Sequence, residues 1–119
     1  MVTKSEALRD RSKQFAVSVV KFFRLLPRTE EARVIGRQLL RSATSVAANY
    51  RAAGRARSRA EFISKISMVV EEADETVFWV ELLIDAEIVR KKEVETLLAE
   101  ANELLAIFAA SLRTAKANR

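Results

Sequence analysis

Apolar residues recur along the chain in steps of three and four, the spacing of one face of an α-helix. Four such segments are expected, at about residues 5–26, 30–53, 59–84 and 91–116. No stretch alternates apolar and polar residues over the length of a strand. The pattern therefore predicts an all-α protein, and the short connections favour an antiparallel up-down-up-down four-helix bundle. We expect residues 1–119 to form a single domain.

Local signals mark where these helices begin and end. Thr3 and Glu6 have the spacing of a capping box, and Ser58 and Glu61 repeat it before the third segment. Gly54 interrupts the second segment and begins a short basic connector. The connection before the fourth segment contains neither Gly nor Pro, so its turn is the least well defined.

Arginines form a stripe along one face of the second segment. At about 100° per residue, five of them fall within roughly 80° of arc: Arg33, Arg37, Arg41, Arg51 and Arg55. Like charges four residues apart repel each other, so the stripe needs a counter-charge. Phosphates could supply it, and so could acidic side chains of another helix or subunit. Arg57 and Arg59 extend the positive charge into the connector, which favours phosphate contact.

Charge is unevenly divided between the two halves of the chain. The net charge is +5, but residues 1–60 carry +10 and residues 61–119 carry −5. This asymmetry suggests an anionic partner for the first half, or packing of one half against the other. We expect a homo-oligomer, because one small bundle cannot easily neutralise this split. Phe78 and Trp79 are adjacent and cannot both enter a narrow core, so one of them is expected at an oligomer contact; a wide apolar face is the alternative.

Several classes of function are disfavoured by composition. The chain has no Cys and no His, which removes thiolate chemistry, the imidazole base and most zinc, copper and haem sites. Carboxylates are frequent in the third segment, but no nucleophile accompanies them, so an enzyme is the least favoured alternative. We therefore expect no catalytic residue, no metal and no cofactor. No apolar run is long enough to cross a membrane and the first ten residues lack a signal core, which predicts a cytoplasmic protein with no membrane partner.

A second row on the second segment is made of small polar residues in steps of four, three and four: Gln38, Ser42, Ser45 and Asn49. Buried polar groups must be paired. We expect this row at a helix–helix seam, with its side chains hydrogen-bonded.

The run from Gln38 to Asn49, followed by Gly54-Arg55, Ser58 and Glu61-Phe62, resembles the family of 23S ribosomal RNA intervening-sequence proteins. The resemblance extends over about residues 8–112. It implies an antiparallel four-helix bundle that assembles into ring-like pentamers. Related accessory proteins of diversity-generating retroelements are similar, and those bind nucleic acid and a reverse transcriptase. The family commonly has Ala-Glu-Gly where this chain reads Arg51-Ala52-Ala53, a departure that strengthens the stripe.

The favoured interpretation is a non-enzymatic, oligomeric accessory protein that binds RNA or DNA. Its expected phosphate contacts are Arg33, Arg37, Arg41, Arg51, Arg55, Arg57 and Arg59. Aromatic residues for base stacking are scarce, and Tyr50 is expected in the core, so binding would follow the backbone. The alternative is a protein–protein scaffold or homo-oligomer that binds no nucleic acid.

Overall fold

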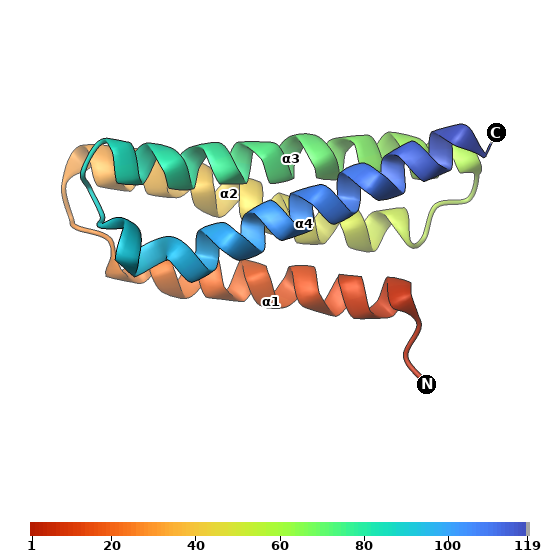
Figure 1. The fold of residues 1–119 in the computed structure, drawn as a ribbon, viewed down its shortest axis with the longest axis horizontal. Coiled ribbons are helices and arrows are strands. Elements are labelled where there is room, and N and C mark those ends of the chain that lie inside the picture. Colours follow the sequence, from red (N-terminus) through yellow and green to blue (C-terminus); the bar gives the residue numbers. More distant parts are fainter. Residues whose placement is uncertain (119) are drawn as a thin grey trace.

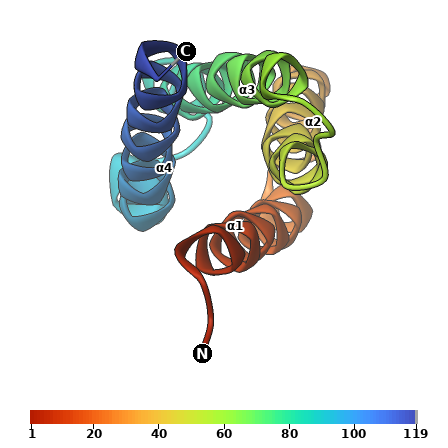
Figure 2. The same cartoon turned by 90° about the vertical axis from the view of Figure 1, so that its right-hand side faces the viewer.

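Four long helices make up most of the chain. The computed structural model describes residues 1–118, and in that part the helices are α1 (Lys4–Leu25), α2 (Glu30–Ala53), α3 (Arg59–Asp85) and α4 (Lys91–Ala117). Successive helices run in opposite directions, and their order around the bundle is the order in the sequence (Figures 1 and 2). The predicted antiparallel four-helix bundle is confirmed, and every helix end lies within about one residue of its expected position.

The first helix begins as its sequence predicts. The Thr3 hydroxyl accepts a hydrogen bond from the Glu6 amide at 3.0 Å, and the Glu6 carboxylate accepts one from the Thr3 amide at 3.3 Å. Before α3, the Ser58 hydroxyl accepts from the Glu61 amide at 3.1 Å. The Glu61 carboxylate lies 4.0 Å from Arg57 Nε instead of completing a second capping box.

The core runs along the axis of the bundle and takes residues from all four helices. Its largest fully buried apolar side chains are Val19, Leu39, Val46, Ile66, Val69, Val80, Leu83, Val94, Leu104 and Phe108. Tyr50 is also buried, with its ring 5.0 Å from that of Phe108, so the expectation of a core tyrosine is confirmed.

Gly36 allows α1 and α2 to approach closely near their turn. A Cβ atom at this position would lie 2.5 Å from Leu26 Cδ1 and 3.1 Å from the Phe23 ring. Leu26 is itself buried, so it has little room to move aside. The absence of a side chain at Gly36 is therefore a packing requirement.

The turn between α3 and α4 is closed by a Schellman motif. The Ile88 amide donates to the Leu83 carbonyl at 3.0 Å, and the Glu87 amide donates to the Ile84 carbonyl at 2.9 Å. Glu87 has φ 59° and is the one non-glycine residue with positive φ within residues 1–118. Gly is the usual residue at this position of the motif. Because Glu87 stands there instead, the sequence gives no signal for the turn.

The contact between α1 and α4 is the least extensive of the four neighbouring pairs. Figure 2 shows the two helices diverging at the open side of the bundle. Arg11 bridges them, with Nη2 2.6 Å from Glu100 Oε1 and 2.8 Å from Glu103 Oε1. The hydrogen bonds to Glu100 and Glu103 raise the pKa of Arg11 above its ordinary value.

Candidate nucleic-acid interface

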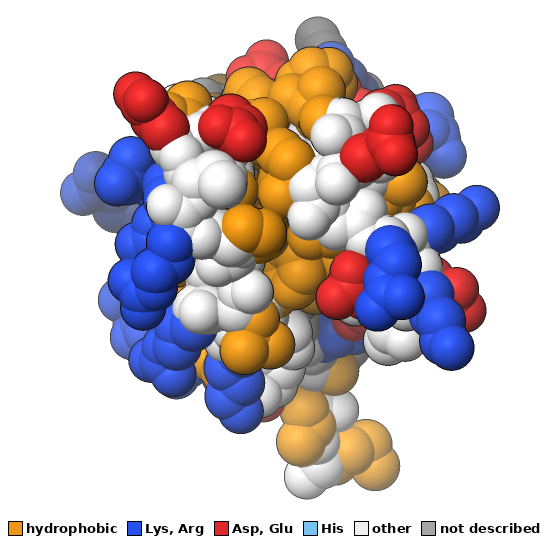
Figure 3. Space-filling view, turned by 90° about the vertical axis from the view of Figure 1, so that its left-hand side faces the viewer, with side chains coloured by type: hydrophobic (Ala, Val, Ile, Leu, Met, Phe, Trp, Pro, Cys, Tyr) orange, Lys and Arg blue, Asp and Glu red, His pale blue; other side chains and the backbone are white. Residues whose placement is uncertain are grey.

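One groove and the arginine stripe of α2 determine what the basic half of the molecule can bind. Lys and Arg side chains gather along one side of the bundle, over α2 and its border with α1, whereas the opposite side carries both signs of charge (Figure 3). The arginines expected to contact phosphates all lie on or just beyond α2, but they are not equivalent.

Arg41 is paired within the chain. Its Nη1 lies 3.1 Å from Glu72 Oε2, its Nη2 lies 2.9 Å from Glu75 Oε1, and its Nε donates to Gln38 Oε1 at 3.4 Å. Both carboxylates belong to α3. The counter-charge of Arg41 therefore comes from carboxylates of a neighbouring helix, one of the two sources considered for the stripe.

The carboxylates that hold Arg41 also influence each other. A side-chain hydrogen bond with Glu72 raises the pKa of Glu75 above its ordinary value; burial and the Glu72 charge act in the same direction, and Arg41 opposes them. Glu72 is the more enclosed member, with its side chain 12% exposed, against 44% for Glu75. Both carboxylates are ion-pair partners of Arg41.

Arg33 and Arg37 differ in their contacts with the rest of the protein. The Arg33 guanidinium carbon lies 4.7 Å from the centre of the Phe23 ring, in a cation–π contact between α2 and α1. Arg33 is half-buried, whereas Arg37 is exposed and forms no ion pair with another residue of the described chain.

Arg51 and Arg55 line a groove between α1 and α2, which we call the basic groove. It encloses about 580 Å³. Across it, α1 contributes Arg9, Asp10 and Lys13. The remaining lining is small: Thr44, Ala47 and Ala48. Four cations thus face one carboxylate, and that carboxylate is 3.8 Å from Arg9 Nε.

Arg9 and Lys13 were missed by the sequence analysis, although a signal for them exists. They are four residues apart and lie on the same face of α1. The short turn after α1 makes α2 fold straight back, so residues early in α1 must lie beside residues late in α2. This antiparallel register brings Arg9 and Lys13 next to Arg51.

The connector arginines remain accessible. Arg57 Nε lies 4.0 Å from Glu61, and its side chain is 90% exposed, so this pair restrains it little. Arg59 is exposed at the first turn of α3 and forms no ion pair within residues 1–118. Both lie near the end of the bundle where α2 stops, beyond Arg55.

The four residues of the polar row of α2 lie in three different environments. Ser42 is fully buried against α3, where its hydroxyl is 2.9 Å from that of Thr76. Asn49 is half-buried and donates to the carbonyl and the hydroxyl of Ser45 at 3.0 and 2.9 Å, within its own helix. Gln38 accepts from Arg41 on the outer edge of the seam.

Phe78 and Trp79 point in different directions from α3. Phe78 is 53% exposed, whereas Trp79 is half-buried and packs against the core. The two rings meet edge to face with centroids 4.9 Å apart. The Trp79 indole nitrogen is buried and has no hydrogen-bond partner among the described residues.

No group of three or more acidic side chains in residues 1–118 is arranged to hold a metal ion. None of the four helices in that range combines the length and apolar character needed to cross a bilayer.

Comparisons with known proteins agree with this architecture. The profile of the 23S rRNA-intervening sequence protein family matches residues 5–110. The chain belongs to this family. A solved structure of a protein of unknown function from the S23 ribosomal protein family of Bacteroides thetaiotaomicron is similar, with a TM-score of 0.85 and 34% identity over 93% of this chain and 99% of that one. No curated protein matches the chain.

Proposed function

We propose that this member of the 23S rRNA-intervening sequence protein family is a non-enzymatic, homo-oligomeric accessory protein that binds nucleic acid through the basic groove. The observation that supports this proposal is the arrangement of cations from two helices around one hollow: Arg9, Lys13, Arg51 and Arg55. Of the carboxylates in the described chain, Asp10 alone lies among them. Such a concentration of positive charge attracts phosphates and raises the rate of encounter with a polyanion.

The composition of the groove favours contact with the nucleic-acid backbone over reading of bases. Its floor consists of Thr44, Ala47 and Ala48, which offer no aromatic surface for stacking. Tyr50, the aromatic residue next to it in sequence, is buried against Phe108. The proposed binding is therefore driven by charge and shows little sequence preference.

RNA is the favoured ligand because the family name refers to a segment of 23S rRNA. An RNA ligand implies a cytoplasmic location, and the family resemblance favours a pentameric ring. Arg37, Arg57 and Arg59 are exposed and supply secondary phosphate contacts along the same side. Arg33 and Arg41 are engaged by Phe23 and by the α3 carboxylates, and we assign them a structural role.

The experiment is a filter-binding titration of the wild-type protein with a structured RNA at several salt concentrations. The four cations of the basic groove alone predict that log Kobs falls by at least about 2.8 units per log unit of salt for single strands, at about 0.7 per contact, or about 3.6 at the 0.9 per contact of duplex DNA, and the secondary contacts steepen this slope. Failure to retain RNA at about 50 mM salt contradicts the proposal. Light scattering on the same sample tests the oligomer separately.

A protein–protein scaffold is the second candidate, and the setting of Phe78 favours it. This exposed ring lies on the same outward face of α3 as Glu71, Asp74, Glu81 and Asp85, all of which are exposed. A large apolar side chain surrounded by charges is typical of the centre of a polar protein interface. A stable oligomer that binds no RNA at low salt would favour this candidate over the first.

A further inference from the structure

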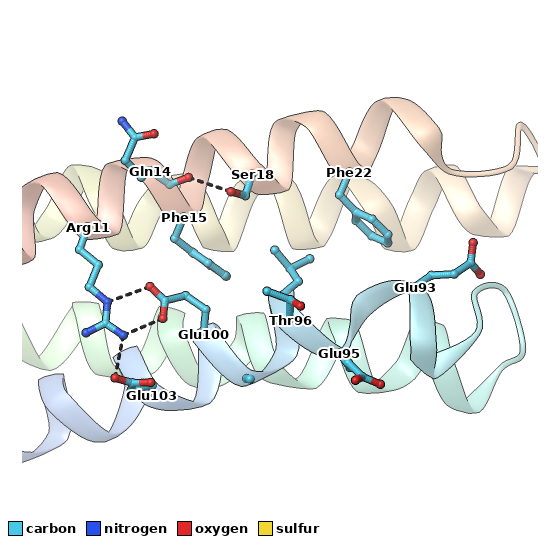
Figure 4. A pocket seen from close by; sticks show the side chains of 12 residues that line it. Arg11, Gln14, Phe15, Ser18, Phe22, Glu93, Glu95, Thr96, Glu100 and Glu103 are labelled. Atoms are coloured by element: carbon cyan, nitrogen blue, oxygen red, sulfur yellow. Dashed lines mark hydrogen bonds and ion pairs between the residues drawn. The ribbon is translucent and has the colours of Figure 1, made fainter.

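The open side of the bundle contains a second hollow, which we call the α1–α4 cleft. It encloses about 760 Å³ between α1 and the first half of α4. Phe15 and Phe22 point from α1 toward α4 and form an apolar floor together with Leu97, and Arg11 closes one end through Glu100 and Glu103 (Figure 4).

The rim of this cleft is acidic, unlike that of the basic groove. Among residues 1–118, its lining contains Glu93, Glu95, Glu100 and Glu103 against the single cation Arg11. Four carboxylates and one guanidinium give this rim a formal charge of −3. Arg11 is already paired with Glu100 and Glu103. A polyanion is repelled by such a rim, and the partner that fits it is apolar in the middle and cationic around the edge.

The same chain carries a surface of that description at the end of α1. Leu25, the last residue of the helix, is 82% exposed, although the next residue, Leu26, is buried in the core. The cations Lys21, Arg24 and Arg28 surround it in sequence; all three are exposed, and none forms an ion pair with another described residue. We call these four residues the Leu25 tip.

We propose that the Leu25 tip of one copy docks into the α1–α4 cleft of a second copy, with Leu25 on the apolar floor and its three cations against the acidic rim. This inference rests on the homo-oligomeric part of the proposed function and names the contact that forms the oligomer. Complementary charge favours the pairing of a tip with a cleft. Two tips would repel each other because both are cationic, and two clefts because both are acidic. The basic groove uses other residues and stays available to RNA in the assembled protein.

The test compares the mass of the full-length chain and its variants by light scattering at micromolar concentration. Wild type is expected at a multiple of 13.4 kDa, and Leu25→Asp at the monomer mass of 13.4 kDa. Val34→Asp is the matched control, because Val34 is also an exposed apolar residue, at 50%, but lies on α2 outside the tip. This control is expected to keep the wild-type mass. Circular dichroism verifies that each variant is folded.

Mixing two variants tests the pairing itself. The double variant Glu95→Lys/Thr96→Arg places cations in the cleft at two exposed positions and is expected to be monomeric. It keeps an intact tip, whereas Leu25→Asp keeps an intact cleft. An equimolar mixture is therefore expected to contain heterodimers at twice the monomer mass.

Three results overturn the inference. One is a mixture that remains monomeric. The charge reversal Lys21→Glu/Arg24→Glu changes the tip but leaves Leu25 in place. A second contradicting result is that this variant and Leu25→Asp both keep the wild-type mass. Neither of these two results contradicts RNA binding through the basic groove. They would mean that another surface forms the oligomer. The third, a monomeric wild type, overturns the oligomeric part of the proposed function together with the inference.

Discussion

The Thr76 hydroxyl lies 2.9 Å from the Ser42 hydroxyl in the buried seam between α3 and α2. Ser42 is 0% and Thr76 1% exposed. Each hydroxyl also lies close to a carbonyl of its own helix, Leu39 O at 3.1 Å and Glu72 O at 2.8 Å. Because both side chains are fully paired, this polar contact is tolerated in an otherwise apolar seam.

Replacing Ser42 with Ala should lower the free energy of unfolding by about 0.5–1.5 kcal/mol, through the lost hydrogen bond. Thr76 still has the Glu72 carbonyl as a partner, which limits the loss. Asn49→Ala is the control, because Asn49 bonds only within its own helix and is half-buried; a change within about 0.5 kcal/mol is expected. Urea denaturation measures both, and equal losses would contradict the assignment of Ser42 to the seam.

Replacing Gly36 with Ala should destabilise the protein by about 1–3 kcal/mol, because the new methyl group collides with Leu26 and Phe23. The other glycine supplies the control. Gly54 has φ −64°, and a Cβ there would meet nothing closer than the Arg51 carbonyl oxygen at 3.4 Å. Gly54→Ala should therefore stabilise by about 0.4–1 kcal/mol. A shift of both melting temperatures in the same direction would contradict this account of the α1–α2 contact.

Replacing Glu87 with Gly should stabilise the protein by about 0.5–1 kcal/mol, because a side chain in the left-handed region costs about 1–2 kcal/mol, offset in part by the greater flexibility of unfolded glycine. Ala86, the preceding residue, has φ −81° and needs no such freedom. Ala86→Gly should give no gain. Calorimetry distinguishes the two outcomes, and a destabilised Glu87→Gly variant would argue against the Schellman motif.

The Glu72–Glu75 pair should make stability depend on pH in a defined direction. The pKa of Glu75 in the folded state is raised above its ordinary value of 4.5, so the folded state holds this proton more tightly than the unfolded chain. Stability from Glu75 is then fully present below pH 4.5 and is lost as the pH rises through the folded-state pKa. Relative to wild type, Glu75→Gln should gain stability as the pH rises above 4.5, and the gain should shrink with salt because Glu75 is partly exposed. Urea midpoints that show the opposite trend would contradict the pKa direction.

The fold could be predicted from the sequence because each helix carries its own signals. Periodic apolar residues, the cap at Thr3 and the stop at Gly54 all act locally, and the structure places the helices where they indicate. The left-handed turn at Glu87 had no such signal, since Glu is not a residue that favours positive φ.

The candidate site was predicted only in part, because it depends on the register between helices. A helical wheel places Arg41 on the same face as Arg37, but it cannot show that Glu72 and Glu75 of α3 lie opposite Arg41. A helical wheel of α2 also cannot show that Arg9 and Lys13 of α1 line the other side of the basic groove. Both facts follow from packing between segments distant in sequence.

The central claim is that phosphates bind in the basic groove and not along the whole arginine stripe. Arg51→Gln and Arg41→Gln test it directly, because each removes one positive charge from the same face of α2, one in the groove and one paired with α3. The measurement is the slope of log Kobs against log salt for a fluorescently labelled single-stranded RNA. We predict that Arg51→Gln makes this slope shallower by about 0.7 and that Arg41→Gln leaves it unchanged. Equal slopes for the two variants, or a larger change for Arg41→Gln, would contradict the account.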